Sequence, residues 1–142
     1  MIIGRFDQRG RPFIRGRLII PRLQVDSPVD FMVDTGADVT CLHPGDLRPL
    51  GIETRFVPEG SPIEASGIGG SGRYFEEIAV LQFEDDTETR YYAINLYIAE
   101  PNQEMEGLPS VVGRDVVNRW RIIYDPEIGR LECAVRSADA TF

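Results

Sequence analysis

One segment of the sequence places a carboxylate where it could do chemistry. An apolar stretch from Phe31 to Val33 runs directly into Asp34, and Thr35 and Gly36 follow. A strand flanked by core rarely ends in an unpaired carboxylate, because burying an uncompensated charge is costly. The Thr35 hydroxyl and the Gly36 amide are donors that could stabilise Asp34, and a glycine lets a ligand approach the backbone closely. Asp34 is therefore the first candidate for a catalytic acid or base.

Two later segments extend this pattern. The stretch Gly-Ile-Gly-Gly occupies 67–70, and Val-Val-Gly-Arg-Asp occupies 111–115. Together with Asp-Thr-Gly-Ala-Asp at 34–38, they resemble the active-site loop, the flap tip and the late apolar-apolar-Gly-Arg motif of retropepsin-like aspartic peptidases. A single Asp-Thr-Gly would be a weak signal, whereas three matching segments in the right order are specific. The resemblance covers roughly residues 13 to 135.

The resemblance implies a role for each matching position. Asp34, Thr35 and Gly36 would form the catalytic loop: Asp34 supplies a carboxylate, Thr35 braces the loop of a second subunit, and Gly36 presents its backbone to the substrate. Asp38 and Arg114 would pair and pin this loop against a helix, a task that suits a bidentate arginine. The positions implied to line apolar substrate pockets or to form the flap are Ala37, Val39, Cys41, Gly67, Ile68, Gly69, Gly70 and Val111.

The chemistry of this family implies an assembly. Amide hydrolysis by this route uses two carboxylates that share one proton: one activates a water, and the other donates to the carbonyl oxygen. The chain has one Asp-Thr-Gly and no Asp-Ser-Gly. We therefore expect a homodimer whose two copies of Asp34 meet on a two-fold axis and hydrolyse peptide bonds without a metal or cofactor. The alternative is a catalytically inactive domain of the same fold that acts as a dimerisation or peptide-binding module.

Two details qualify the resemblance. Ala37 lacks the hydroxyl that pepsin-like relatives carry there, and a hydroxyl would stabilise the charged carboxylate. We expect the pair to keep its shared proton to higher pH, with activity at mildly acidic to near-neutral pH rather than in strong acid. The chain also has additional N-terminal sequence from Met1 to Phe13. In retroviral enzymes both chain ends build the dimer sheet, whereas the tail Arg136 to Phe142 reads as polar and irregular.

Short strand-like runs separated by turns dominate the chain. They predict an all-β fold, an acid-protease-type closed β barrel with one short C-terminal helix, as a single domain over 1–142 with its core at about 13–135. We expect a turn at Asp26-Ser27-Pro28, a helical turn from Leu47 to Leu50 and the helix from Arg114 to Trp120. The expected strands are Ile2 to Phe6, Phe13 to Ile20, Val29 to Val33, Ile78 to Phe83, Tyr91 to Ile98, Arg121 to Tyr124 and Arg130 to Val135. The fourth and fifth of these carry apolar residues on both faces, as in strands buried on two sides.

The composition argues against two classes of partner. The formal net charge is -8 and the sequence pI is about 4.6, which disfavours nucleic acid and anionic membrane surfaces. No apolar run approaches the roughly 18 residues of a membrane span. The charged start, with Arg5 and Asp7 among its first residues, does not read as a signal peptide, so we expect a cytoplasmic protein.

Alternative interpretations exist for three features. Residues 67–72 also fit the dinucleotide pattern G-x-G-x-x-G, which would require a buried strand before it and a helix after it. His43, the one histidine, has no partners at metal-ligand spacing and is interpreted as an exposed turn residue. Cys41 and Cys133 are interpreted as reduced, partly buried thiols, because two cysteines are too few for a disulfide scaffold.

Overall fold

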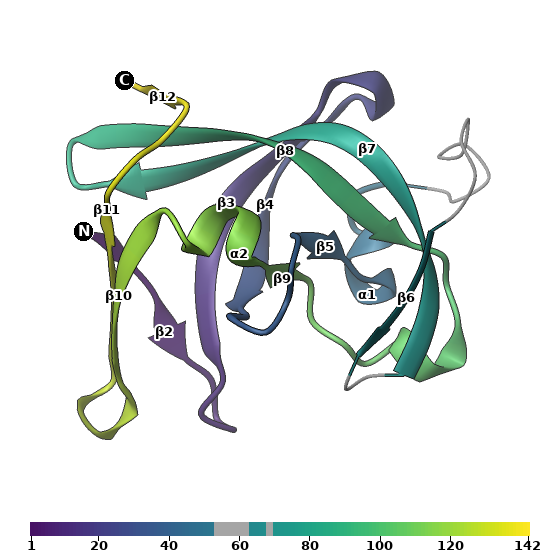
Figure 1. Cartoon of the computed structure of the whole chain (residues 1–142), viewed down its shortest axis with the longest axis horizontal. Helices are drawn as coiled ribbons and strands as arrows, with labels where there is room; N and C mark the ends of the chain where they lie inside the picture. The colour runs from purple at the N-terminus through teal and green to yellow at the C-terminus, as the bar shows by residue number, and fades with distance from the viewer. Residues whose placement is uncertain (53–62, 68–69) are drawn as a thin grey trace.

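A closed six-strand β barrel forms the body of the molecule (Figure 1), in a computed structural model that describes residues 1–52, 63–67 and 70–142. Strands make up 54% of the structure, which confirms the all-β class. The strands are β1 (Ile2–Ile3), β2 (Arg5–Phe6), β3 (Pro12–Ile20), β4 (Val25–Val33), β5 (Cys41–Leu42), β6 (Ile63–Gly67), β7 (Gly70–Asp85), β8 (Glu88–Ala99), β9 (Val111–Val112), β10 (Trp120–Asp125), β11 (Arg130–Val135) and β12 (Ala140–Thr141). The helices are α1 (Pro44–Leu47) and α2 (Arg114–Val117), with 3-10 turns η1 (Pro21–Leu23), η3 (Gln103–Met105) and η4 (Pro126–Ile128).

The barrel follows the order β8-β5-β9-β4-β3-β7 and closes where β7 pairs with β8. β6 extends it beyond β7 as an antiparallel hairpin, and β2 pairs with the start of β3. A short turn after Asp85 joins β7 and β8, the two longest strands. The β6–β7 hairpin occupies the position that the resemblance assigns to the flap, and we call it the flap hairpin.

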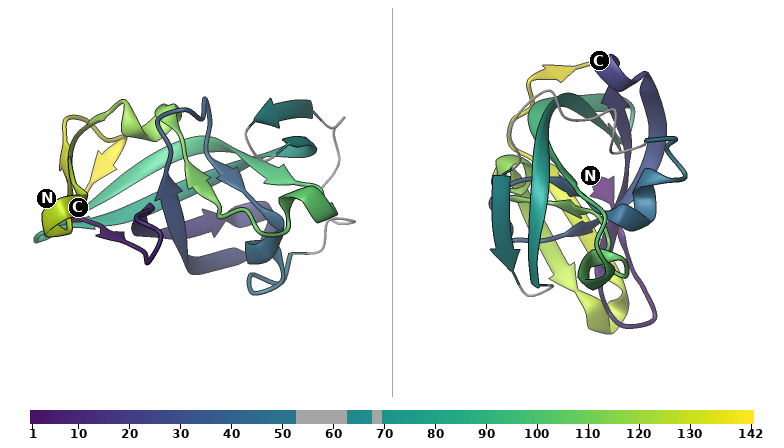
Figure 2. Two further views of the ribbon diagram at one scale, coloured as in Figure 1. Left: turned by 90° about the horizontal axis from the view of Figure 1, so that it is seen from below. Right: turned by 90° about the vertical axis from the view of Figure 1, so that its right-hand side faces the viewer.

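A separate three-stranded sheet, β1-β11-β10, lies at the other end of the molecule from the flap hairpin (Figures 1 and 2). Its register places Ile2 opposite Cys133 and Trp120 opposite Val135. We expected an irregular C-terminal tail, and this expectation is wrong. Ala140 pairs with Tyr91, so that β12 adds to the edge of β8. Both described chain ends are therefore hydrogen-bonded to strands of their own chain.

The barrel strands alternate between core and solvent. In β3, Ile14 and Leu18 are buried while Arg15 between them is exposed, and in β4 Phe31 is fully buried. The exposed arginine forms an ion pair with Asp30 on β4, its cross-strand neighbour. Burial that alternates from one residue to the next is what a barrel with a packed interior and a solvent-exposed exterior requires.

We expected β7 and β8 to be buried on both faces, but their side chains alternate between core and solvent in the same way. Ile78 is 72% exposed, whereas its neighbour Ala79 and the next inward residue, Leu81, are fully buried. The strands are thus buried on one face only, because no second layer covers this part of the barrel exterior among the described residues. The exposed isoleucine gave these strands their two-sided apolar appearance.

Three element boundaries also differ from the sequence expectation. β4 begins at Val25, so the expected turn at 26–28 lies inside a strand. Pro28 is tolerated there because β4 pairs on its other side with β9 only at Met32 and Val33. The helical turn is α1 at Pro44–Leu47, since proline favours the first turn of a helix. The late helix ends at Val117, and Trp120 starts β10 instead of ending the helix.

Candidate active site

The insertion of β9 between β4 and β5 creates the site. Met32 and Val33 of β4 pair in parallel with Val111 and Val112, and Cys41 of β5 pairs with Val111 on the other side. The Asp34 amide then donates to the Val112 carbonyl at 3.0 Å. Segments 34–41 and 111–115, far apart in the sequence, are therefore brought together, as their resemblance implies.

Asp34 begins a tight turn at the end of β4. Its Oδ1 accepts a hydrogen bond from the Gly36 amide at 2.9 Å, and its carbonyl accepts one from the Ala37 amide at 3.2 Å. A Cβ on Gly36 would lie 3.2 Å from this same Oδ1, so the absence of a side chain keeps the space beside the carboxylate open. Asp34 is half-buried, and Thr35 and Gly36 are exposed. The carboxylate is thus held by backbone and remains accessible from solvent.

The start of α2 braces the loop from behind. Arg114 Nη1 donates to the Thr35 carbonyl at 2.9 Å, its backbone amide donates to the Ala37 carbonyl at 2.8 Å, and its Nη2 pairs with Asp38. The Asp38 side chain is largely exposed, and exposed ion pairs contribute little to stability. The two contacts to loop carbonyls therefore position the loop more than the ion pair does. The expected pairing of Asp38 with Arg114 is present in this geometry.

A second brace was not anticipated from the sequence. Thr40 is fully buried; its amide donates to Asp115 Oδ2 at 3.0 Å, and its hydroxyl donates to Asp115 Oδ1 at 2.8 Å. The Gly113 amide donates to the same hydroxyl oxygen at 3.3 Å. The sequence does contain a signal for this contact. Asp115 ends the Val-Val-Gly-Arg-Asp segment, and a carboxylate beside a buried strand needs hydrogen-bond donors.

The positions expected to line substrate pockets lie around this loop. Ala37 and Val39 are half-buried beside Asp34, and Val111 is buried between the strands. Cys41 is half-buried; burial, with the nearby charges of Asp115 and Asp34, raises the pKa of its thiol to about 12. The thiol is therefore protonated at neutral pH, which suits an apolar wall and not a nucleophile.

The glycine-rich segment lies at the end of the flap hairpin, where Gly67 of β6 pairs with Gly70 of β7. Ile68 and Gly69, which the sequence assigns to the flap tip, lie outside the described residues. Because the described residues on both sides of them are antiparallel strands, the segment does not lead from a strand into a helix. The dinucleotide interpretation of 67–72 is therefore wrong.

His43 is not the exposed turn residue that we expected. It is 6% exposed, and its extended backbone directs the ring inward just before Pro44 begins α1. Around it lies a second apolar cluster, separate from the main core, built on Tyr74, Ala99 and Met105. No local pattern in the sequence predicts this cluster, because its members lie on separate elements of the fold.

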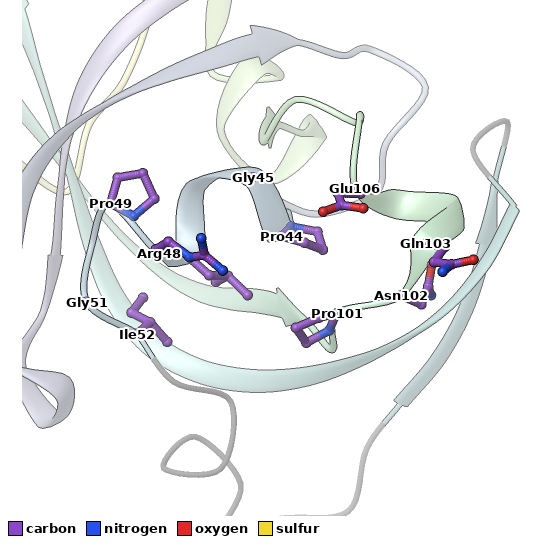
Figure 3. A pocket seen from close by; sticks show the side chains of 11 residues that line it. Pro44, Gly45, Arg48, Pro49, Gly51, Ile52, Pro101, Asn102, Gln103 and Glu106 are labelled. Atoms are coloured by element: carbon purple, nitrogen blue, oxygen red, sulfur yellow. The ribbon is translucent and has the colours of Figure 1, made fainter.

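A cavity of about 990 Å³ lies between α1 and the loop that contains η3 (Figure 3). Pro44, Arg48, Ile52, Pro101 and Glu106 are among its lining residues. No residue of the Asp34 loop lines it, so this cavity is separate from the candidate active site. Among the described residues, no group of three His, Cys, Asp or Glu side chains could hold a metal ion. The helices in this part of the chain lack the length and hydropathy that a membrane span requires.

Comparison with solved structures bears on the fold of the chain. The chain is similar to a retropepsin-like aspartic protease from Rickettsia conorii, with a TM-score of 0.54 and 16% identity over 93% of this chain and 88% of that chain. The EIAV protease complexed with the inhibitor HBY-793 gives a TM-score of 0.49 and 17% identity over 80% of this chain and 90% of that chain. No protein-family model and no curated protein matches the sequence. The fold is retropepsin-like, as the three sequence segments predicted.

Proposed function

We propose that the protein is an aspartic endopeptidase that acts as a homodimer, with a catalytic pair made of Asp34 from each subunit. The observation that carries this proposal is the Asp34 turn: an accessible carboxylate at a strand end, held by the Gly36 amide and braced through Arg114. A water between two such carboxylates would be activated by the ionised one, while the protonated one donates to the scissile carbonyl. This chemistry needs no metal.

The surrounding residues then have distinct tasks. Thr35 and Gly36 would contact the second loop and the substrate backbone, whereas Asp38 and Arg114 hold the loop in place. The flap hairpin, with Gly67, Ile68, Gly69 and Gly70 at its end, would close over the peptide and exclude water. Ala37, Val39, Cys41 and Val111 offer apolar walls and so favour peptides with apolar side chains beside the cleaved bond.

Incubation with a peptide library across pH tests the proposed activity. We expect cleavage next to apolar residues, with an optimum at mildly acidic to near-neutral pH, because Ala37 donates no hydroxyl hydrogen bond toward the carboxylates. A statine-type transition-state mimic should slow cleavage, and a metal chelator should not. An optimum in strong acid, or inhibition by the chelator alone, would contradict this mechanism.

We place the dimer contact away from the two chain ends. β1 pairs with β11 and β12 pairs with β8, so each described end already lies in a sheet of its own subunit. β10 is an edge strand, paired only with β11 along its described length. Figure 1 shows the β10–η4–β11 hairpin reaching the same lower edge of the molecule as the β2–β3 turn. On this hairpin Tyr124 is 54% exposed and Ile128 is 68% exposed, which favours contact with a second subunit.

Replacing Ile128 by Glu should therefore weaken the dimer at least about tenfold, because a charge would be buried without a partner. Analytical ultracentrifugation over a range of concentrations measures this change. The matched control is Ile78→Glu, which alters an equally exposed isoleucine on β7 and should leave the dimer unchanged. If only the Ile78 variant dissociates, the contact lies on the barrel exterior and not on the β10–β11 hairpin.

A further inference from the structure

Tyr74 occupies the junction between the barrel and the flap hairpin. Residues 70–73 of β7 pair only with β6, and residues 75–85 pair with β8 along the barrel. Tyr74 does both: it is opposite Ile63 in the flap hairpin and opposite Ala99 in the barrel. Its side chain is 9% exposed. Tyr74 therefore lies where the flap hairpin joins the barrel.

His43 holds this junction from inside. Its Nε2 lies 3.0 Å from the Tyr74 hydroxyl, and its Nδ1 lies 2.6 Å from the Pro109 carbonyl. Its backbone amide donates to Ser110 Oγ at 3.0 Å, and that hydroxyl donates to Asp46 Oδ2 at 2.5 Å. One buried imidazole thus links the flap junction to the turn that leads into β9, and β9 pairs with β4, whose end leads into the Asp34 loop.

The chemistry of the partners decides where the imidazole proton lies. A carbonyl can only accept, so Nδ1 carries the hydrogen that is donated to Pro109. Nε2 of the neutral ring is then an acceptor, and the Tyr74 hydroxyl donates to it. Burial lowers the pKa of His43, although the Pro109 carbonyl and the charges of Asp46 and Asp34 oppose this shift. The neutral ring that accepts from Tyr74 is therefore the form present at neutral pH.

The loop at 100–110 contacts the same junction from a second side. The Glu100 amide donates to the Arg73 carbonyl at 2.7 Å. The Met105 side chain is 1% exposed and fills the space at Gly72, where a Cβ would overlap its sulfur. Met105 also packs with Tyr74 in the second apolar cluster. The flap hairpin is thus anchored outside the main core, by a small cluster in which His43 makes the polar contact.

We propose that His43 is a positioning residue that sets the angle of the flap hairpin through its hydrogen bond with Tyr74. The inference extends the proposed peptidase function, because a flap held at a set angle is ready to close over a peptide. His43 does not touch the reacting atoms. Its loss should weaken peptide binding and leave the chemical step unchanged.

Three variants distinguish the roles of the two ring nitrogens of His43. In His43→Asn the amide nitrogen replaces Nδ1 and keeps the Pro109 contact, but nothing reaches Tyr74. In His43→Gln the longer side chain places an amide oxygen near the Nε2 position and restores an acceptor for the hydroxyl. Tyr74→Phe removes the hydroxyl and keeps the buried ring.

Hydrogen–deuterium exchange of the backbone amides in the flap hairpin is the first readout. We expect about tenfold faster exchange in His43→Asn and Tyr74→Phe, the change that loss of one buried hydrogen bond produces. Exchange in His43→Gln should stay near that of the wild type, and amides of β3 and β4 should not change in any variant. The double variant His43→Asn/Tyr74→Phe should exchange no faster than His43→Asn alone.

Cleavage of a library peptide is the second readout, with KM raised about tenfold and kcat nearly unchanged in the same two variants. Equal acceleration of exchange in β3, β4 and the flap would show a general structural role and overturn the proposal. Unchanged flap exchange in Tyr74→Phe would overturn it as well, and this variant suffices if His43→Asn does not fold. Should the wild type cleave no peptide, the peptidase function fails, while the exchange data still decide the role of His43.

Discussion

Replacement of Asp34 by Asn should reduce peptide cleavage at least about a thousandfold without loss of the fold. An amide has nearly the shape of the carboxylate and can still accept from the Gly36 amide, so the turn should remain. It cannot take up a proton from water, and the neighbouring carboxylates of Asp38 and Asp115 are already bound by Arg114 and Thr40. Cleavage of a peptide found by library screening measures the rate, and far-ultraviolet circular dichroism measures the fold.

Asp26→Asn provides the matched control for this substitution. Asp26 lies on the same strand, β4, and its exposed ion pair with Arg17 contributes little. We expect cleavage by this variant within about twofold of the wild type. If the Asp34 variant binds peptide as the wild type does and neither protein cleaves it, the inactive peptide-binding module becomes the better description.

Gly113→Ala should destabilise the protein by about 2–3 kcal/mol and remove activity with it. A Cβ at this position would lie 2.5 Å from the Val39 carbonyl oxygen and 2.9 Å from that of Ala37. Both are backbone atoms, so no side chain can move aside, and β9 must shift away from the Asp34 loop. The shift would also break the contacts that Arg114 makes with this loop. Urea denaturation measures the free energy of unfolding.

Gly107→Ala is the corresponding control in the loop before β9. A Cβ there meets nothing within 4 Å, and the backbone has no positive φ. The change should leave stability the same or raise it by up to about 1 kcal/mol, because alanine reduces the entropy of the unfolded chain. Equal stabilities of the two variants would mean that β9 and the loop do not pack as tightly as described.

Much of the fold follows from local sequence. The strand-like runs of β3, β10 and β11 identify strands that the structure contains, because this signal acts over a few residues. The resemblance of three short segments supplied the topology that local signals could not. Boundaries were less accurate where tertiary pairing overrides propensity, as at Pro28, which is extended because β3 pairs with it.

The residues of the site were also only partly predictable from the sequence. Asp34, Gly36 and Arg114 were identified because their types and order are distinctive. Thr40 and His43 were not, since their importance depends on residues about seventy positions away that fold against them. A histidine followed by proline reads as a turn, and only the packing of Tyr74 and Pro109 around it reveals a buried ring.

Mixing of subunits tests most directly whether two copies of Asp34 form one site. Wild-type chains are refolded together with increasing fractions of the Asp34→Asn variant, and cleavage is measured at constant total protein. If both carboxylates are needed, activity follows the square of the wild-type fraction, so an equal mixture retains about a quarter of it. A linear fall, with about half retained, would show that each chain carries a complete site and would contradict the shared pair.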